Sequence, residues 1–228
     1  MVNIHRCLRA FVFVVAVLLG TACLLTSCEE TSDEWNPYYN WQTRNVQWFT
    51  TVADSARTAI TQAKAQYGDD WEQHCVWRMY KTLQRSADEQ GPLTDSICCR
   101  ILTRGDGTFS PAYTDSVRLS FRGWIMPTEY MNENNQLESR MSVFTQTYYG
   151  EYNPATASPQ TGAVAAFTEG FGTALQYMVK GDDWMVYIPS ELAYGSESSS
   201  AIPAYSTLLF RIHMMGAYES GSGIPEWK

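Results

Sequence analysis

The segment from Met178 to Gly195, MVKGDDWMVYIPSELAYG, restricts the possible folds of this chain more than any other. A charged turn precedes an apolar run, Trp184–Ile188, which is typical of a buried strand. Pro189 ends that strand because proline cannot donate a ladder hydrogen bond. Gly195 then permits a sharp backbone bend. The segment therefore predicts a buried strand that leads into a tight, tyrosine-bearing loop.

The neighbouring segments predict an antiparallel sheet and one short helix. Residues 116–124 alternate between apolar and polar side chains, and apolar runs at 96–102 and 207–215 predict further strands. Phe167–Val179 has the apolar spacing of a helix. Segments 104–111, 127–162 and 196–201 are expected to be loops. The second of them is expected to contain one short strand, near Val143 and Phe144. Residues 91–218 are thus expected to form an α+β domain, a twisted antiparallel β-sheet wrapped on one short helix.

A helical extension is expected to precede this domain, over residues 41–90. Apolar residues recur every three or four positions between residues 41 and 67, and Gly68 is a stop signal. A second helix is expected at 71–86. The apolar stripe of helix 41–67 either packs on its own domain or forms the seam of a homodimer. Residues 219–228 are expected to be a C-terminal tail.

The first 28 residues have the parts of a secretory signal. Two arginines precede an unbroken apolar run at residues 10–20, which is too short to read well as a spanning helix. The segment ends in Leu25-Thr26-Ser27-Cys28, which looks like a bacterial lipobox. We therefore expect a lipoprotein signal peptide at 1–27, a lipid on Cys28 and an acidic tether at 28–40. An ordinary signal peptide with an unmodified Cys28 is the alternative.

Charge and motif content exclude several classes of function. The formal net charge is −8, and it becomes −10 once Arg6 and Arg9 leave with the signal. No Lys/Arg-rich stretch remains, which argues against nucleic acid and anionic lipid as main partners. The sequence has no P-loop, dinucleotide fingerprint, nucleophile elbow or zinc-type spacing, so no cofactor or metal is expected.

The cysteines of the mature chain leave two alternatives open. Cys98 and Cys99 are adjacent in a strand-like run and should point to opposite faces. Cys75 either pairs with one of them in an oxidising compartment or all three are small buried hydrophobes.

The ordered pattern of residues 167–210 resembles the FKBP-type peptidyl-prolyl cis-trans isomerases. The shared order is F-x-x-G-F-x-x-A-L-x-x-M-x-x-G-D-x-W-x-x-Y-I-P-x-x-L-A-Y-G, followed by I-P-x-x-x-x-L-x-F. The segment V-R-L-S-F-R-G also looks like an early strand of that family. Together with the lipobox, the pattern resembles a Bacteroides-type lipoprotein member. Glu29 and Glu30, just after the cysteine, resemble the acidic residues of such lipoproteins and indicate placement in the outer membrane, periplasmic or surface-facing.

The resemblance implies an apolar pocket in which the amide bond before a proline isomerises. It assigns catalysis to Tyr194, Phe171, Phe144 and Phe210. It assigns substrate binding to Phe121, Thr145, Phe167, Thr168, Ala201 and Ile202, with Thr168 acting through its backbone N–H. The partners it implies are proline-containing stretches of exported polypeptides.

Three departures from the family pattern leave a second function open. Thr145 stands where the family has an acidic residue, Phe121 where it has a tyrosine, and Phe171 where it has a tryptophan. The first two changes remove polar groups from the pocket wall. The expected function is therefore an active prolyl isomerase that assists the folding of exported proteins. The alternative is a catalytically weak domain that binds peptides or acts as a chaperone.

Overall fold

The computed structural model describes residues 35–86 and 91–227, and one compact unit extends from Pro37 to Lys228. The predicted signal peptide, Cys28 and most of the predicted tether lie outside the described residues. Within the described part, no helix is both long and apolar enough to cross a membrane.

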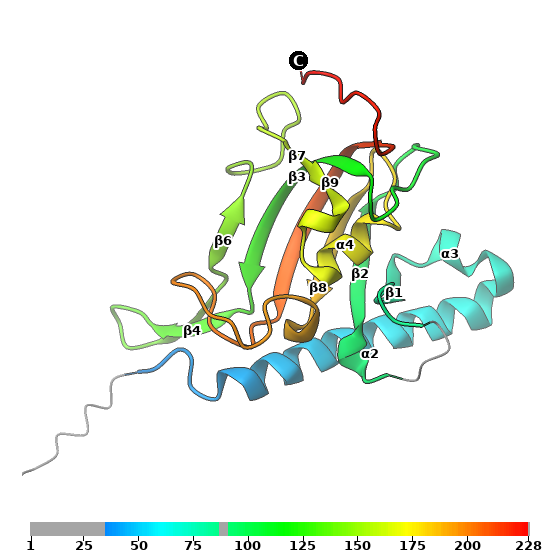
Figure 1. Ribbon diagram of the computed structural model, residues 1–228. Helices are drawn as coiled ribbons and strands as arrows, with labels where there is room; N and C mark the ends of the chain where they lie inside the picture. Colours follow the sequence, from blue (N-terminus) through cyan, green and yellow to red (C-terminus); the bar gives the residue numbers. More distant parts are fainter. Residues whose placement is uncertain (1–34, 87–90, 228) are drawn as a thin grey trace, which may run out of the picture. The chain divides into compact units, whose positions relative to one another are not determined.

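A seven-stranded sheet forms the centre of the unit (Figure 1), and all of its strand pairs are antiparallel. Its strands are β1 (Trp77–Lys81), β2 (Ser96–Thr103), β3 (Ser116–Ile125), β6 (Val143–Gln146), β7 (Gln160–Ala163), β8 (Asp183–Ile188) and β9 (Leu208–Tyr218). The order is β1-β2-β8-β9-β3-β6, and β7 also pairs with β3. The strands predicted at 96–102, 116–124, 184–188 and 207–215 are confirmed.

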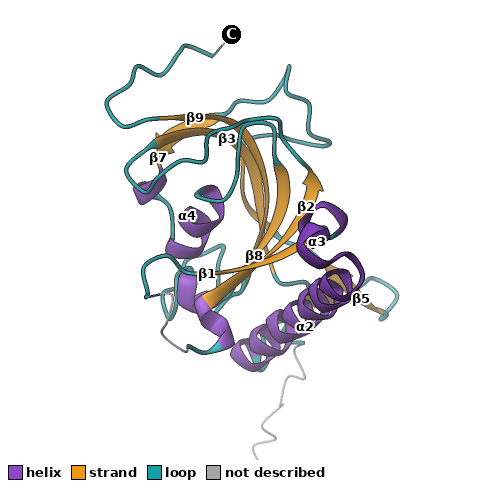
Figure 2. Ribbon diagram, turned by 90° about the vertical axis from the view of Figure 1, so that its right-hand side faces the viewer, coloured by secondary structure: helices purple, strands orange, loops and turns teal. Residues whose placement is uncertain are grey.

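Two helices cover opposite faces of this sheet (Figure 2). They are α2 (Trp41–Tyr67) and α4 (Glu169–Leu175). Cys99 belongs to the core cluster that contains the α4 side chains, whereas Cys98 packs with Phe49 and Ala53 of α2. The fold is therefore α+β, as predicted, with an antiparallel sheet and one short helix inside its curve. The predicted opposition of Cys98 and Cys99 is confirmed.

Helix α2 has the bounds that the sequence predicts. It ends at Gly68, whose positive φ of 55° favours glycine. The middle of its stripe is buried, with Phe49 at 2% and Ala53 and Ala56 at 0% exposure. That stripe packs on the chain's own sheet. Of the two alternatives, the helix packed on its own domain therefore agrees with this structure.

Two polar ties also connect the first turns of α2 to the segment that leads into β9. The Thr207 N–H donates to Asn45 Oδ1 at 2.7 Å, and Trp41 Nε1 donates to Ser206 Oγ at 2.9 Å. All four residues are buried. The start of the chain's compact unit is thereby fixed against a segment about 160 positions later in sequence.

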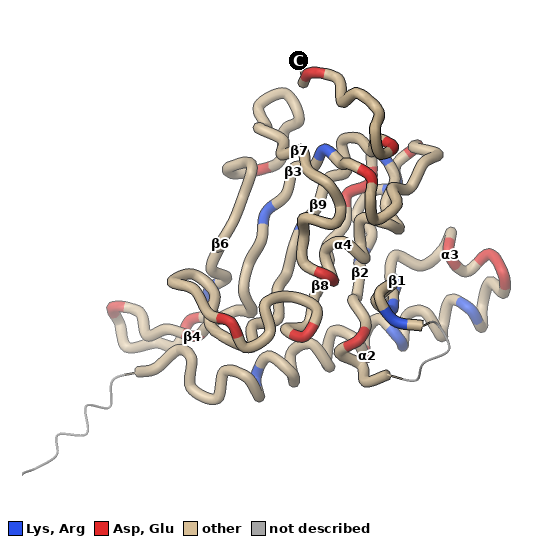
Figure 3. Tube along the Cα trace, in the orientation of Figure 1, with Lys and Arg blue, Asp and Glu red and all other residues tan. Residues whose placement is uncertain are grey.

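Charged side chains are spread over the unit rather than gathered in a basic patch. Figure 3 shows the Lys and Arg positions scattered over α2, the sheet and the connecting loops. This distribution agrees with the absence of a Lys/Arg-rich stretch in the sequence.

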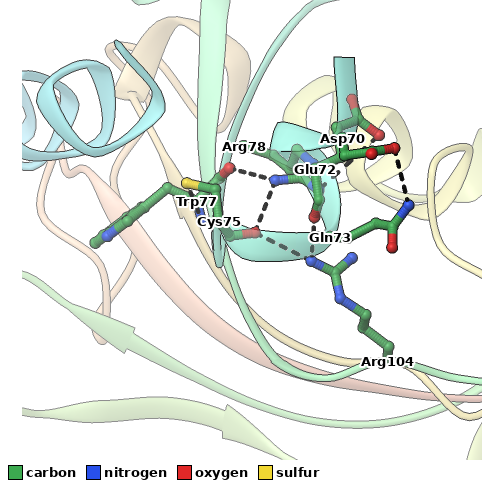
Figure 4. Close-up of polar contacts among 7 residues, drawn as sticks. All are labelled: Asp70, Glu72, Gln73, Cys75, Trp77, Arg78 and Arg104. Atoms are coloured by element: carbon green, nitrogen blue, oxygen red, sulfur yellow. Dashed lines mark hydrogen bonds and ion pairs between the residues drawn. The ribbon is translucent and has the colours of Figure 1, made fainter. Parts of the chain in front are cut away.

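The helix predicted at residues 71–86 is wrong. Only α3 (Trp71–His74) is helical there, after the 3-10 turn η2 (Gly68–Asp70), and β1 follows at once. The buried guanidinium of Arg78 donates to the carbonyls of Glu72 and Cys75, at 2.6 and 3.0 Å, and so closes the end of α3 (Figure 4). Arg104 donates to the same two carbonyls from the end of β2. The predicted helical extension 41–90 therefore contributes an edge strand to the sheet.

The predicted loop at 127–162 contains more regular structure than expected. Strands β4 (Thr128–Met131) and β5 (Leu137–Arg140) form a separate hairpin, and β7 begins near the end of the 127–162 segment. The short strand near Val143 and Phe144 is confirmed as β6. The remaining short elements are the 3-10 turns η3 (Leu93–Asp95), η4 (Val164–Ala166) and η5 (Ser190–Leu192).

The three cysteines at positions 75, 98 and 99 are free and buried. The alternative of a disulfide from Cys75 is therefore wrong in this structure, and these residues are small buried hydrophobes. Burial raises the pKa of the Cys98 thiol to about 12, so it stays protonated at neutral pH.

Candidate active site

Helix α4 sits close to the sheet because glycine lies at its contact point. A Cβ added to Gly170 would lie 2.4 Å from Ile188 Cγ2 and 3.1 Å from Leu192 Cβ. No other residue fits without displacing the helix. This close approach fixes the position of Phe171, which follows on the same helix and is 2% exposed.

The loop that holds Tyr194 is fixed by backbone hydrogen bonds. The N–H groups of Ala193 and Gly195 both donate to the Ser190 carbonyl, at 3.0 and 2.8 Å. Gly195 has a φ of +56°, the left-handed conformation that its sequence position predicts. Tyr194 is left 45% exposed at the rim of the sheet.

Between α4, this loop and the sheet lies a hollow of about 500 Å³. Eight of the ten predicted pocket residues line it: Phe121, Phe144, Thr145, Phe167, Thr168, Phe171, Tyr194 and Phe210. The sequence analysis missed three further lining residues, Gln160, Gly162 and Ala166. They lie on β7 and η4, where the run of small residues in TGAVAA was the available signal for close backbone approach. We name this hollow the central hollow.

Aromatic rings form the walls of the central hollow. Phe171 meets Phe210 edge to face, with ring centroids 4.8 Å apart and an interplanar angle of 88°. Phe167 stacks on Phe171 at 4.8 Å, and Phe144 meets Phe210 at 5.4 Å. Such pairs hold one another in fixed orientations and contribute about 0.5–1.5 kcal/mol each beyond burial. The walls are therefore rigid as well as apolar.

Gly123 of β3 is what allows the rings to close over the sheet. A Cβ at this position would lie 2.6 Å from Phe210 Cε1 and 2.8 Å from Phe144 Cζ. The glycine leaves the space that these two rings occupy.

Polar residues also line the central hollow, namely Thr145, Gln160, Thr168 and Tyr194. The Thr168 N–H lies just before α4, and no acceptor for it is found among residues 35–86 and 91–227. The same holds for the hydroxyl of Tyr194 within the part of the chain that the structure describes. Both are free to donate to a carbonyl oxygen placed in the central hollow.

Ala201 and Ile202 do not line the central hollow. Ile202 packs against the core cluster and, with Tyr194, borders a neighbouring hollow of about 270 Å³. Ala201 is exposed in the loop between β8 and β9. Its predicted contact with the pocket is therefore wrong in this structure, because the loop places its side chain toward solvent.

A buried polar row crosses the outer face of the sheet, opposite α4. Ser120, His213 and Asp183 are register neighbours on β3, β9 and β8. His213 is 5% exposed; its Nδ1 lies 3.4 Å from Asp183 Oδ1, and its ring stacks on Tyr152 at 3.5 Å. Arg211 forms an ion pair with Asp183 at 2.7 Å. Burial lowers the pKa of His213 to about 4, helped by Arg211 and opposed by Asp183.

The fold and the hollow together define a small-ligand or peptide site with aromatic walls and several hydrogen-bonding side chains, and none of its lining residues is Asp, Glu, His, Lys or Arg. Within the described residues, no group of three or more His, Cys, Asp or Glu residues could hold a metal ion.

Residues 108–215 match the family model of the FKBP-type peptidyl-prolyl cis-trans isomerase. This part of the chain, 108 of its 228 residues, is similar to that family. The chain is 28% identical over 166 residues to an FKBP-type 22 kDa peptidyl-prolyl cis-trans isomerase of Escherichia coli, covering 72% of this chain and 66% of that protein. It is 40% identical over 124 residues to the outer membrane protein MIP of Legionella longbeachae, covering 54% of this chain and 45% of that protein.

A solved structure of FkpA from Escherichia coli is also similar to the chain. The sequences are 16% identical, the TM-score is 0.42, and the match covers 90% of this chain and 80% of that one. This chain spans 66% of the length of the 22 kDa isomerase, slightly less than two thirds.

Proposed function

We propose that this protein is a peptidyl-prolyl cis-trans isomerase whose active site is the central hollow. The observation that carries the proposal is the set of phenylalanine rings that pack on one another around the hollow, together with two lining residues, Thr168 and Tyr194, whose N–H and hydroxyl have no acceptor within the described residues. Tyr194, Phe171, Phe144 and Phe210 act on the reacting amide. Phe121, Thr145, Phe167 and Thr168 bind the flanking chain. Ile202 contributes from the neighbouring hollow.

The chemistry of this reaction requires no acid, base or metal. An X–Pro amide isomerises over a barrier of about 18–20 kcal/mol that resonance sets, and it takes tens to hundreds of seconds in water. The planar amide is more dipolar than the twisted one. An apolar hollow therefore favours the twisted transition state over the planar ground state, which is differential binding. Donation from Thr168 N–H or Tyr194 to a substrate carbonyl orients the chain.

The clients we propose are proline-containing segments of exported proteins. The signal-like first 27 residues and the lipobox that ends at Cys28 support an envelope protein held to a membrane by lipid on that cysteine. The Legionella relative is named as an outer membrane protein, which also supports placement in a bacterial outer membrane. We also propose a homodimer through helix 41–67, and light scattering on the isolated protein tests it: a monomer at high concentration would refute the dimer.

A second function, peptide binding with weak turnover, is favoured by one feature of the central hollow. Thr145 and Phe121 both line it, and neither supplies the carboxylate or hydroxyl that the family pattern has at those positions. The wall contributed by β3 and β6 is therefore less polar than in the pattern. Loss of orienting groups lowers turnover more than it lowers apolar binding.

The test is isomerisation of a set of X-Pro peptides by the chain from Glu29 onward, which contains the whole compact unit. We expect acceleration that falls at least tenfold in Tyr194→Ala and Phe171→Leu. Tyr149→Ala and Phe109→Leu are matched controls, because these side chains are 84% and 36% exposed and lie outside the central hollow. A folded protein that accelerates no peptide refutes the enzyme, and measurable peptide affinity would then support the binding function.

A further inference from the structure

Three hollows of the FKBP-like domain adjoin one another through shared lining residues, and we call them together the track. The central hollow shares Phe167 and Thr168 with a second hollow of about 360 Å³, and it shares Tyr194 with the hollow of about 270 Å³. The two outer hollows adjoin the central one at different residues, Phe167 and Thr168 for one and Tyr194 for the other. A peptide whose proline occupies the central hollow can therefore place flanking side chains in either of them.

The first outer hollow depends on the segment that precedes the domain. Its walls include Leu83 and Gln84, which follow β1, together with Thr168 and Glu169 before and within α4. A hydrogen bond from Thr82 Oγ1 to Glu169 Oε1 ties that segment to α4 and orients the carboxylate. We name this the Glu169 hollow.

The second outer hollow lies under the loop between β8 and β9. It is lined by Tyr194, Glu197, Ser198, Ser199 and Ile202. The N–H of Glu197 donates to the Tyr194 carbonyl at 3.0 Å, which keeps this glutamate next to the rim tyrosine. We name this the Glu197 hollow.

The charge along the track has one sign. Glu169 and Glu197 are the charged residues among those that line the three hollows, and none of the lining residues is Lys or Arg. Neither glutamate has an ion-pair partner within residues 35–86 and 91–227. Figure 3 shows the acidic positions at the start of α4 and on the loop between β8 and β9.

The nearest basic residues on the preceding segment are already engaged. Arg85 pairs with Asp95, and Lys81 donates to the Ser86 carbonyl. Within the described residues, neither Arg85 nor Lys81 forms an ion pair with Glu169.

We infer that the track selects proline segments that carry a Lys or Arg side chain on either side of the X-Pro bond. This inference rests on the proposed function, because it places the proline in the central hollow. A long cationic side chain lays its methylene stem along the apolar wall and its charge at the glutamate. A solvent-accessible pair of this kind changes affinity about two- to fivefold.

The experiment measures kcat/KM on peptides with one Leu-Pro bond and a single Lys, Ala or Glu two or three residues before or after it. We expect the order Lys, Ala, Glu at low ionic strength on both sides. The Lys-to-Glu ratio should shrink in 0.5 M NaCl, because salt screens exposed charges. Glu169→Gln should abolish the ratio on one side of the proline, and Glu197→Gln on the other.

Glu219→Gln is the matched control, since it removes the same charge from an exposed position after β9 and outside the track. Equal rates on all peptides that are accelerated would overturn the inference and leave the isomerase intact. A Lys preference that survives both track variants, or that falls equally in Glu219→Gln, would also overturn it, because it would come from the general charge of −8. A failure to accelerate any peptide would instead refute the proposed function.

Discussion

Removing the imidazole of His213 should flatten the acid dependence of stability. His213 is buried and its pKa is lowered to about 4, from an ordinary value near 6.5. Between these two values the unfolded chain binds a proton that the folded chain does not. The contribution of His213 to the free energy of unfolding is therefore fully present above pH 6.5 and is lost as the pH falls toward 4. The loss from this one group is about 2 kcal/mol at pH 5 and about 3 kcal/mol at pH 4.

The assay is urea unfolding at pH 7.5, 6, 5 and 4.5 on the protein and on His213→Gln and His213→Phe. Carboxylates contribute to acid sensitivity in every chain, so the quantity to compare is the difference between the protein and each variant at each pH. We expect each variant to be destabilised at pH 7.5, because Asp183 and Tyr152 lose their contacts with the ring. That deficit should then shrink by about 2 kcal/mol by pH 5.

His74 supplies the matched control. It is exposed and stacks on Tyr67 at the end of α2, so His74→Gln removes an imidazole without opening the buried row around Asp183. The free energy of unfolding could instead fall in parallel for the protein and both His213 variants between pH 7.5 and 4.5. That result would refute the assignment of this acid sensitivity to burial of His213.

Two further outcomes are expected. Gly170→Ala should lower the free energy of unfolding in urea by about 1–3 kcal/mol and lower kcat/KM, because its Cβ would lie 2.4 Å from Ile188 Cγ2. Gly172→Ala is the control and should keep both quantities, because its Cβ would lie 3.4 Å from its nearest neighbour. Equal effects of the two substitutions would contradict the packing argument. Arg78→Met should lower the free energy of unfolding in urea by about 2–4 kcal/mol, since the carbonyls of Glu72 and Cys75 lose a charged donor. A decrease of less than about 0.5 kcal/mol would show that Arg104 alone satisfies these carbonyls.

The sequence predicted the parts of the fold whose signals are local. The stripe of α2, the stop at Gly68 and the strand that ends before Pro189 each rest on spacing or on one backbone-restricting residue. The resemblance of residues 121–210 to the family pattern likewise predicted eight of the lining residues of the central hollow, six of them aromatic.

The errors fall where tertiary contacts override local pattern. Val76, Met79, Tyr80 and Leu83 have helical spacing, but β1 pairs with β2 and Arg78 closes α3 instead. The lining residues Gln160 and Gly162 lie on a strand that pairs with β3 and has no alternation of its own. Ala201 failed because the sequence does not encode which side of a loop faces solvent.

The position of β9 has a consequence for the order in which the domain forms. β9 is the last strand in sequence, yet it lies between β8 and β3 in the middle of the sheet. While the chain emerges from a ribosome or an export channel, β3 and β8 present open edges to the surroundings until residues 208–218 arrive. The ties of Asn45 and Trp41 to Thr207 and Ser206 close at the same late moment. The β8-β9-β3 part of the sheet can therefore close only once residues 208–218 are present, and we expect a nascent chain that stalls before Leu208 to be prone to aggregation.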